Sequence, residues 1–295
     1  IGYDTRKLSE EISQKIKNFY SQKGIDVLLS DCPIPTPTVS FSVKNTNSDF
    51  GIVITASHNS KIWNGIKIKN KHGQSISEKQ ANRLTSIISK EKISEEDFKK
   101  FDAFKSDQND SIDLMSDYIE SIKNIVDIEK IKSTNLNIVV DCMFGTSSSI
   151  LKKLLQSNKC NVEEINTTND SSFPGIKQPE PIDENLSELK LKVKQSHADI
   201  GFAFDADSDR VGVIDNKSNY IEAPYTFCVI IDHVLGNKKI VKNISTTVSM
   251  TSMIDSIVKK YGVNCFRTKV GFKYVAPNMK KNDSILGGEE SGGYS

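Results

Sequence analysis

Three stretches of this sequence repeat one order of elements: an apolar strand, a polar turn, an amphipathic helix and a second strand. The stretches run from Ile1 to Leu29, from Asn137 to Ile165 and from Lys239 to Arg267. In each, apolar residues recur at the spacing of one helix face, between runs typical of buried strands. This order builds parallel or mixed sheets covered by helices. The repetition therefore predicts three α/β domains of related build.

Cap and stop residues place the ends of the expected helices. Ser9 and Ser249 stand where an N-cap is expected, since a serine hydroxyl can accept from the free amides of the first turn. Gly24 and Gly262 stand where a glycine ends a helix in the left-handed conformation. The strands that follow are expected from Ile25 to Leu29 and from Val263 to Arg267.

Composition shifts divide the chain. Glu91–Asp110 is highly charged and reads as exposed helix and loop, and Asp127–Asn135 is a plausible linker. Asn169–Asp183 carries three prolines and is expected to be an irregular crossover with little regular structure. A second boundary is expected near Leu235–Asn237. We therefore expect domains at residues 1–132, 133–236 and 237–295.

Charge and cysteine usage exclude several classes of protein. Lys and Arg number 39 against 38 for Asp and Glu, so no basic field argues for nucleic acid. No apolar run approaches the length of a membrane span. The five cysteines form no C-x-x-C pair, and the four histidines lack metal-ligand spacing. We expect reduced, mostly buried thiols in a cytoplasmic protein, although the missing initial methionine makes the lack of a signal peptide uninformative.

A first candidate loop, Thr55–Asn59, follows the apolar run Gly51–Ile54. Ser57 would lie at a strand end beside His58, a position that suits a nucleophile or phosphoryl carrier. The chain then returns through a second expected strand, Ile66–Lys69, which could aim Lys67 back at the serine. Taken alone, the five residues favour an ordinary polar turn, since Ser, His and Asn are common in turns.

A second candidate loop places Asp205, Asp207 and Asp209 at alternate positions, and Arg210 follows at once. It lies between two strand-like runs, Ile200–Phe204 and Val211–Ile214. Three carboxylates converging in one turn repel each other unless a divalent cation binds them. An EF-hand would need Gly and Glu where the chain has Arg210 and Asn216, so that alternative is weak. A solvated acidic turn would not explain the flanking apolar strands.

A third candidate loop is the glycine-rich stretch Gly287–Gly293. Glycine allows a ligand to approach the backbone closely, and the carboxylate of Glu289 with the hydroxyl of Ser291 suits paired sugar hydroxyls. Lys269 follows an expected strand upstream and could add a cation to the same cleft. A glycine-rich surface loop would look similar.

Taken together, the motifs resemble those of the α-D-phosphohexomutases, the phosphoglucomutase/phosphomannomutase type, over essentially the whole chain. The phosphoserine motif T-A-S-H-N-P resembles Thr55 to Asn59, D-x-D-x-D-R resembles Asp205 to Arg210, and G-E-x-S-G resembles Gly288 to Gly292. The G-x-D-x-R turn at Gly2–Arg6 and the P-T-P segment at Pro35–Pro37 fit the same order. Each motif is modest alone, but five in order are specific.

The resemblance implies a fold and a set of roles. It implies α/β domains around a central active-site cleft, named phosphoserine, metal-binding and sugar-binding in chain order. Mg²⁺ would be bound by Asp205, Asp207, Asp209 and a phosphoserine oxygen of Ser57. His58 and Lys67 would move a proton, which requires a lowered lysine pKa, and Arg6 would add charge. The substrate contacts would be Arg210, Lys269, Gly288, Glu289 and Ser291.

The implied reaction interconverts hexose 1-phosphate and hexose 6-phosphate through a phosphoserine and a hexose bisphosphate. The expected partners are glucose or mannose phosphate and the bisphosphate, with no nucleic acid and no membrane. The alternative is a non-catalytic module that binds a sugar phosphate or a divalent cation.

The chain also departs from the family pattern. Ser60 stands where the family usually has proline, and Gly293 where many members have histidine. Segments that the family carries before Ile1 and after Ser295, including a fourth domain with a phosphate-binding loop, are not in this sequence. We therefore expect an incomplete third domain, no fourth domain, and poor turnover by this chain alone.

Overall fold

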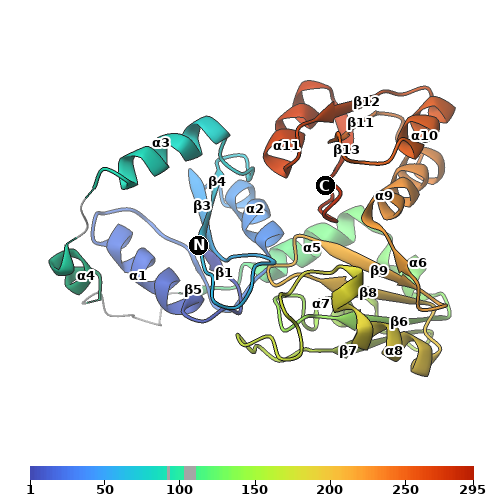
Figure 1. The fold of residues 1–295 in the computed structure, drawn as a ribbon, viewed down its shortest axis with the longest axis horizontal. Coiled ribbons are helices and arrows are strands. Elements are labelled where there is room, and N and C mark those ends of the chain that lie inside the picture. The colour runs from blue at the N-terminus through green and yellow to red at the C-terminus, as the bar shows by residue number, and fades with distance from the viewer. Residues whose placement is uncertain (92–93, 103–110) are drawn as a thin grey trace.

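Three separate sheets, each with its own helices, form the framework of the chain (Figure 1). The structure is a computed structural model and describes residues 1–91, 94–102 and 111–295. The first sheet and its helices form one side of the molecule, and the second and third lie one above the other on the opposite side (Figure 1). The three α/β units expected from the repeated pattern are confirmed.

The first sheet has the order β1–β3–β4. Its strands are β1 (Gly2–Tyr3), β3 (Phe50–Ile54) and β4 (Ile66–Asn70), with β1 parallel and β4 antiparallel to β3. The helices α1 (Ser9–Ser21) and α2 (Thr36–Asn45) contact it. They cover opposite faces, because side chains alternate along a strand: Ile52 and Ile54 pack in the cluster that α1 joins, and Val53 packs with α2.

The rest of this region lies outside that sheet. The short strands β2 (Leu29–Ser30) and β5 (Ser111–Ile112) pair in parallel, and α5 (Met115–Ile125) contacts α2. The helices α3 (Glu78–Ile88) and α4 (Glu95–Asp102) lie toward the outside. The expected helix and loop over Glu91–Asp110 are confirmed only for α4, since residues 92–93 and 103–110 lie outside the described part of the chain.

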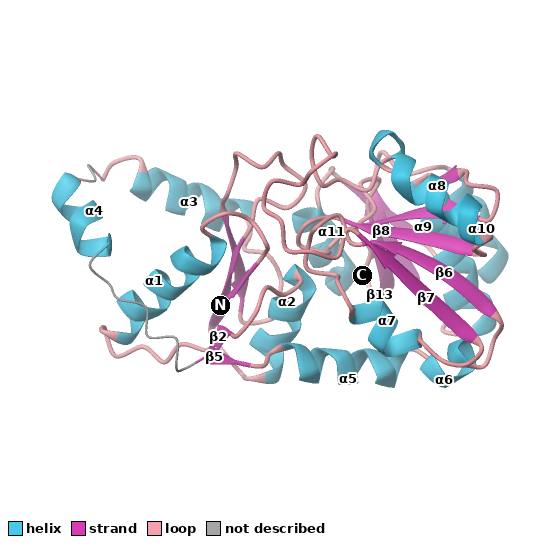
Figure 2. Cartoon of the chain, turned by 90° about the horizontal axis from the view of Figure 1, so that it is seen from below, coloured by secondary structure: helices cyan, strands magenta, loops and turns pink. Residues whose placement is uncertain are grey.

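The second sheet has the order β10–β9–β8–β6–β7, in which β8, β6 and β7 are parallel and the β8–β9 and β9–β10 pairings are antiparallel. Figure 2 shows this sheet edge-on, with helices against it and loops gathered beside its strand ends. Val139 points into the cluster on the α8 side, and its neighbours Ile138 and Val140 point into the opposite cluster. The elements are β6 (Leu136–Asp141), β7 (Cys160–Ile165), β8 (Ile200–Phe204), β9 (Val211–Asp215), β10 (Tyr220–Ile221), α6 (Ile128–Lys132), α7 (Ile150–Leu155), the 3₁₀ turn Asp183–Asn185 and α8 (Ser187–Ser196).

The third sheet is built around one central strand, in the order β12–β11–β13, and both pairings are parallel. Ile244 on the central strand is fully buried in a cluster with Phe227 and Ile254. The elements are α9 (Ala223–Asp232), a π-helical turn (His233–Asn237), β11 (Asn243–Thr247), α10 (Met253–Tyr261), β12 (Cys265–Thr268), α11 (Phe272–Lys281) and β13 (Ser284–Gly288).

Some expected boundaries are wrong. Ser9 is the first helical residue and does not cap α1, because its hydroxyl donates to Asp4. Ser249 also does not cap a helix: α10 begins four residues later, after Ser252. The strand expected at Ile25–Leu29 is reduced to β2. The first strand of the third stretch, β11, begins at Asn243 rather than at Lys239.

The expected linker Asp127–Asn135 is also wrong, because it contains α6. Asp127 caps this helix by accepting a hydrogen bond from the amide of Lys130, and Ile128 is buried in the core beside β6. A linker would leave that side chain exposed. Asn169–Asp183 has no regular helix or strand before its last residue, as expected.

The cysteines behave as expected: all five are free, and Cys142, Cys160 and Cys228 are buried. Within the described residues, no helix is both long and apolar enough to cross a lipid bilayer.

Buried hydrogen bonds join the first two units. The hydroxyl of Thr5 donates to the carbonyl of Phe144 at 2.8 Å, and the amide of Thr36 donates to the carbonyl of Asp207 at 2.8 Å. The third unit contacts the second where the amide of Val211 donates to the carbonyl of Gly292 at 3.1 Å. These contacts hold the three candidate loops at one place.

Candidate active site

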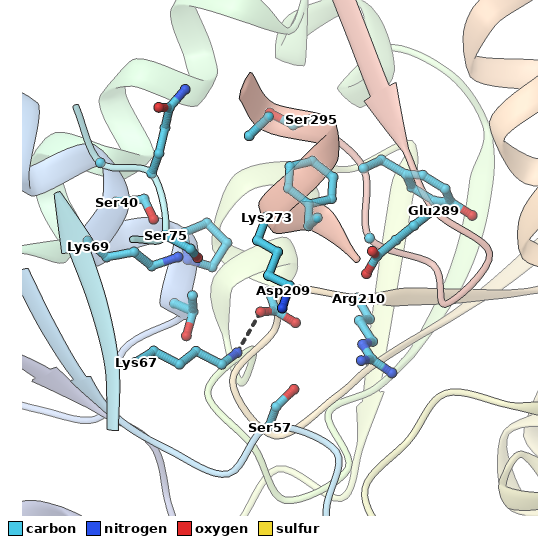
Figure 3. A pocket seen from close by; sticks show the side chains of 18 of the residues that line it. Ser40, Ser57, Lys67, Lys69, Ser75, Asp209, Arg210, Lys273, Glu289 and Ser295 are labelled. Atoms are coloured by element: carbon cyan, nitrogen blue, oxygen red, sulfur yellow. Dashed lines mark hydrogen bonds and ion pairs between the residues drawn. The ribbon is translucent and has the colours of Figure 1, made fainter. Parts of the chain in front are cut away.

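The serine loop and the acidic loop meet, although they are far apart in the sequence. Ser57 comes three residues after β3, and Asp205 comes directly after β8. The Ser57 hydroxyl donates a 2.9 Å hydrogen bond to Asp205 Oδ2. Figure 3 shows Ser57 at one end of a cavity that Glu289, from the third loop, also faces. The structure thus brings residues of all three candidate loops to one site.

The loop around Ser57 is held by buried polar groups. Ser57 itself has φ 50°, a left-handed conformation that is uncommon for a residue with a side chain. Its amide donates to the hydroxyl of Thr55 at 2.8 Å, and that hydroxyl donates to Asp4 Oδ2 at 2.6 Å. Strained backbone of this kind persists where the surroundings fix it, and such places often carry function.

Arg6 lies beneath this loop, and its side chain is almost fully buried. Its guanidinium forms a 3.2 Å ion pair with Asp4. It also donates to four backbone carbonyls, those of Ser57, Asn59, Ser60 and Trp63. The sequence suggested that Arg6 adds charge to the reacting group, whereas its contacts make it a residue that positions the loop.

The three aspartates form a group that fits a cation. One oxygen from each of Asp205, Asp207 and Asp209 lies within 4.8 Å of the others. Asp207 Oδ1 is buried and has no hydrogen-bond partner among the described residues. A buried carboxylate oxygen is costly without a partner, and oxygen ligands are what Mg²⁺ and Ca²⁺ prefer. The residues present therefore fit a divalent cation.

Burial and close charges shift the pKa values of two of the three aspartates, Asp205 and Asp207. Burial, and then the carboxylates of Asp207 and Asp209, raise the pKa of Asp205 well above its usual value. Burial would also raise the pKa of Asp207, but its hydrogen-bonded ion pair with Lys67 outweighs this and lowers that pKa. One ammonium therefore compensates only part of the negative charge in this group.

Lys67 is the lysine that supplies that ammonium. Its Nζ donates to Asp207 Oδ2 at 2.6 Å. It also donates to Asp209 Oδ2 at 2.8 Å, the contact that is dashed in Figure 3. The expectation of a lowered lysine pKa is wrong in this structure. Burial would lower the pKa of Lys67, but the two carboxylates together raise it above its usual value. As it stands, Lys67 is a fixed positive charge.

Asp207 also accepts from a residue that the sequence did not single out. The Thr36 hydroxyl donates to Asp207 Oδ2 at 2.5 Å, beside the backbone hydrogen bond between the same two residues. Thr36 lies in the segment Pro35–Pro37, which contributed to the resemblance without an assigned role. The sequence does not show that Thr36 contacts Asp207, because only the fold brings the start of α2 next to the acidic loop.

His58, Glu180 and Arg210 form a second polar group. His58 Nδ1 is 3.5 Å from the Ser57 hydroxyl, and His58 Nε2 is 3.9 Å from Glu180 Oε1. Glu180 also accepts from Arg210 at 3.1 Å. Burial, and then Arg210, lower the pKa of His58, which favours the neutral imidazole. Sequence reasoning missed Glu180, because it lies in the irregular crossover where no periodic pattern marks a site residue.

The glycine-rich loop presents Glu289 to the cavity. The Ser291 hydroxyl donates to Glu289 Oε1 at 2.6 Å, and burial raises the pKa of Glu289. Gly292 has φ 87°, and a Cβ there would lie 2.8 Å from the Val211 carbonyl oxygen, so only glycine fits. Gly288 packs against the Phe227 ring, and its carbonyl accepts from Thr246.

One cavity of about 1320 Å³ joins these groups. Among the predicted site residues, the following line it: Ser57, His58, Lys67, Asp209, Arg210 and Glu289. Lys269 does not line it, and its ammonium lies 5.9 Å from the ring centroid of Tyr274. Lys273, on α11, lines the cavity instead. Lys269 precedes this helix, so no periodic pattern in the sequence pointed from one lysine to the other.

Comparisons with family models match most of the chain. Three models, described as phosphoglucomutase/phosphomannomutase α/β/α domains I, II and III, match residues 1–95, 116–218 and 224–295. They follow one another in the order in which the three sheets occur. None of these matches assigns a role to an individual residue.

Individual proteins that resemble this chain belong to the same family as the matching models. The chain is 35% identical to a phosphoglucomutase/phosphomannomutase of Thermococcus kodakarensis, over 99% of this chain and 62% of the relative. It is 32% identical to a phosphoglucosamine mutase of Prochlorococcus marinus, over 99% of this chain and 63% of the relative. A crystal structure of a phosphoglucomutase/phosphomannomutase family protein from Burkholderia thailandensis aligns with TM-score 0.80 and 25% identity, over 99% of this chain and 62% of that one. The chain thus spans less than two thirds of the length of these relatives.

Proposed function

We propose a function for this chain on the basis that it belongs to the phosphoglucomutase/phosphomannomutase family. The proposed reaction interconverts hexose 1-phosphate and hexose 6-phosphate, with Ser57 carrying the phosphoryl group. The observation that carries this proposal is the hydrogen bond from the Ser57 hydroxyl to Asp205, inside a group of three carboxylates. A serine so placed can hold a phosphoryl group next to a divalent cation.

In the first half-reaction, phosphorylated Ser57 faces a sugar hydroxyl in the cavity. The bond from phosphorus to the serine oxygen breaks, and a bond from phosphorus to the sugar oxygen forms, which gives a hexose bisphosphate. The sugar hydroxyl loses its proton to a base of the protein. In the second half-reaction the other phosphate of the bisphosphate returns to Ser57, and the proton returns to the oxygen that it leaves.

We infer that the cation is Mg²⁺, held by Asp205, Asp207 and Asp209 together with a phosphoserine oxygen. When bound, it would draw negative charge from the transferring phosphoryl group. Lys67 and Arg210 supply further positive charge at the site from the protein itself. Transfer of a phosphoryl group depends mainly on such positioning and charge.

The base must accept the proton of the sugar hydroxyl. His58 is the better candidate in this structure, because burial and Arg210 favour its neutral form and it lies beside Ser57. Lys67 carries its proton here and could act as a base only if the charge of its carboxylate partners were neutralised. Glu289 and Ser291 would hold sugar hydroxyls, and Lys269 would contribute charge at longer range. Gly288 would support this loop by packing on the Phe227 ring rather than by contacting the ligand.

We propose a first domain limit near residue 132. The second limit falls before α9 rather than at residue 236, because α9 packs in the cluster of the third sheet.

The test uses residues 1–295 as they are. The chain is incubated with Mg²⁺ and glucose 1,6-bisphosphate, and its intact mass is measured. We expect one added phosphoryl group, located on Ser57 by peptide mapping, and its loss on addition of a hexose monophosphate. Ser57→Ala should gain none, and the control Ser60→Ala, in the same loop, should behave like the parent. A parent chain that stays unmodified would leave only the binding-module alternative.

The preferred substrate is identified by measuring how fast each of several sugar monophosphates removes the phosphoryl group from Ser57. Glucose, mannose and glucosamine phosphates are the relevant members, because the relatives include mutases of each kind. The sugar that removes the phosphoryl group fastest from Ser57 is the preferred one.

A further inference from the structure

Lys69 is a buried cation that the proposed reaction does not use. Its side chain lines the cavity, yet the residue is only 7% exposed. Within the described residues, no hydrogen bond or ion pair involves its ammonium, in contrast to Lys67 two positions earlier. Lysine is rarely buried without a partner, because the removal of an ammonium from water is costly.

The strand register explains how the chain places Lys69 there. On the antiparallel pair β3–β4, Lys67 lies opposite Val53, and Lys69 lies opposite Gly51. Opposite residues share a face of the sheet, and Val53 packs toward α2. Both lysines therefore lie on the α2 face. Gly51 has no side chain, so α2 packs directly on the strand beside Lys69: a Cβ on Gly51 would lie 2.6 Å from Val43 and 3.5 Å from Lys69 Cβ.

Two hydroxyls share this end of the cavity. Ser75 faces Lys69 across an isolated bridge, and Ser40 comes from α2. The turn between β4 and Ser75 packs tightly on α2, since a Cβ on Gly73 would lie 2.0 Å from the Ser40 carbonyl oxygen. Figure 3 shows Lys69, Ser40 and Ser75 together on this side of the cavity, away from Ser57. The arrangement is therefore fixed before any ligand arrives.

We propose that Lys69, Ser40 and Ser75 form a binding subsite for a phosphate group, separate from the phosphoryl-transfer residues. One ammonium and two hydroxyls offer donors and a positive charge to a phosphate oxygen, and none of the three brings a negative charge. Lys273 lines the cavity from the α11 side and adds a second positive charge near it, although its Nζ also lies 3.5 Å from Glu78.

Two physical observations support the subsite. Burial, and then Lys67, lower the pKa of Lys69, as expected for a cation that lacks a compensating anion. The cavity of about 1320 Å³ also exceeds the roughly 300–1,000 Å³ of common ligand sites, so it has room beyond one sugar phosphate. Lys69 Nζ is not among the unpaired side-chain atoms that are completely buried, so the ammonium reaches the cavity while the rest of the side chain is covered.

The phosphate has two possible sources: free inorganic phosphate, or the phosphate of the sugar ligand. The subsite itself follows from the geometry, and only the second source rests on the proposed function. The binding test is therefore made in a Ser57→Ala background without metal, so that phosphoryl transfer cannot contribute. Inorganic phosphate is titrated by calorimetry into this parent, into a Lys69→Met variant and into a Lys71→Met control. Lys71 is an exposed lysine on the same hairpin.

We expect Lys69→Met to bind phosphate at least about tenfold more weakly than the parent, and Lys71→Met to bind it equally. Ser75→Ala should weaken binding to a smaller extent. Equal affinity in Lys69→Met overturns the proposal, and so does the absence of phosphate binding to the parent.

A thermal-unfolding measurement guards against misfolding of the variant. In buffer without phosphate, Lys69→Met should unfold at the same or a higher temperature than the parent, because it removes an unpaired buried charge. Added phosphate should raise the unfolding temperature of the parent and of Lys71→Met but not that of Lys69→Met. A phosphate-dependent rise of equal size in Lys69→Met would overturn the proposal as well.

Competition distinguishes the two sources. If glucose 1,6-bisphosphate displaces inorganic phosphate from the parent, and Lys69→Met weakens both, the subsite holds a ligand phosphate. If both bind together, the subsite takes free phosphate. Failure of Ser57 to become phosphorylated would remove the proposed function and leave the phosphate titration unaffected.

Discussion

The hydroxyl of Ser57 lies 2.9 Å from Asp205 Oδ2, although 148 positions separate the two residues. The contact joins a loop after β3 to a loop after β8, and both residues are buried. Burial makes the contact consequential, because the carboxylate cannot rely on water for its hydrogen bonds.

Asp207→Asn should weaken Mg²⁺ binding by at least about tenfold, comparable to the loss of a supporting residue in metal sites. The change removes one negative ligand and also one of the two carboxylates that hold Lys67. Metal affinity can be measured by calorimetry, and the rate of Ser57 phosphorylation by intact mass. Asp26→Asn, an exposed acid in the first unit, is the control. Unchanged Mg²⁺ affinity in Asp207→Asn would exclude this group as the metal site.

Arg6→Met should destabilise the chain by about 3–5 kcal/mol, because it leaves Asp4 buried and uncompensated. It also removes the donors to four carbonyls of the Ser57 loop. Urea unfolding gives the free energy of unfolding, and Arg83→Met on the exposed face of α3 is the control. If Arg6 acted only on the ligand, the two variants would be equally stable.

Gly292→Ala should destabilise the chain by more than Gly24→Ala. Both glycines have positive φ, 87° and 74°, so alanine is strained at either position by about 1 kcal/mol or more. A Cβ on Gly24 meets nothing within 4 Å, whereas one on Gly292 meets the Val211 carbonyl. The unfolding free energy lost in Gly292→Ala, minus that lost in Gly24→Ala, therefore measures the cost of the contact with the Val211 carbonyl. Equal losses would mean that the loop moves freely away from Val211.

Asp141→Asn should change how stability depends on pH. Burial raises the pKa of Asp141 to about 6, whereas the unfolded value is about 3.9. The folded chain therefore keeps this proton to higher pH than the unfolded chain does. The stability that this group contributes is fully present below about pH 4 and is lost as pH rises to about 6. The loss is on the order of 3 kcal/mol.

The asparagine keeps an oxygen for the Met143 amide and cannot ionise. The variant should therefore lack this loss and be more stable than the parent at pH 7. Urea unfolding at pH 4, 5, 6 and 7 measures the effect, with the exposed Asp49→Asn as the control. A variant that follows the parent curve would show that Asp141 ionises normally in the folded chain.

Elements defined by local pattern could be predicted from the sequence. The strands β3, β4, β8 and β9 were found within about one residue, because their apolar runs end in glycine or polar turns. The three loops were found for the same reason. The prediction that Ser9 caps α1 was wrong, because its hydroxyl donates to Asp4 rather than accepting from the helix.

Contacts between distant segments could not be predicted. Glu180 lies in a segment without periodicity. It contacts Arg210 in its own unit and His58 in the first unit, and neither contact can be read from the local sequence. The pKa of Lys67 was expected to be lowered, since nothing local shows that Asp207 and Asp209 would enclose it. Ile128 was assigned to a linker because its neighbours are charged, yet it packs beside β6. Each failure concerns a partner supplied by tertiary packing.

Thr36 binds Asp207 twice, through its amide and through its hydroxyl. Any separation of the first unit from the second would break a buried backbone hydrogen bond and remove one of the donors to Asp207 at the same step. Ser57 and the three aspartates are consequently held in one fixed arrangement by both units. In the reaction proposed above, a sugar bisphosphate would therefore reorient within the cavity while these side chains stay in place.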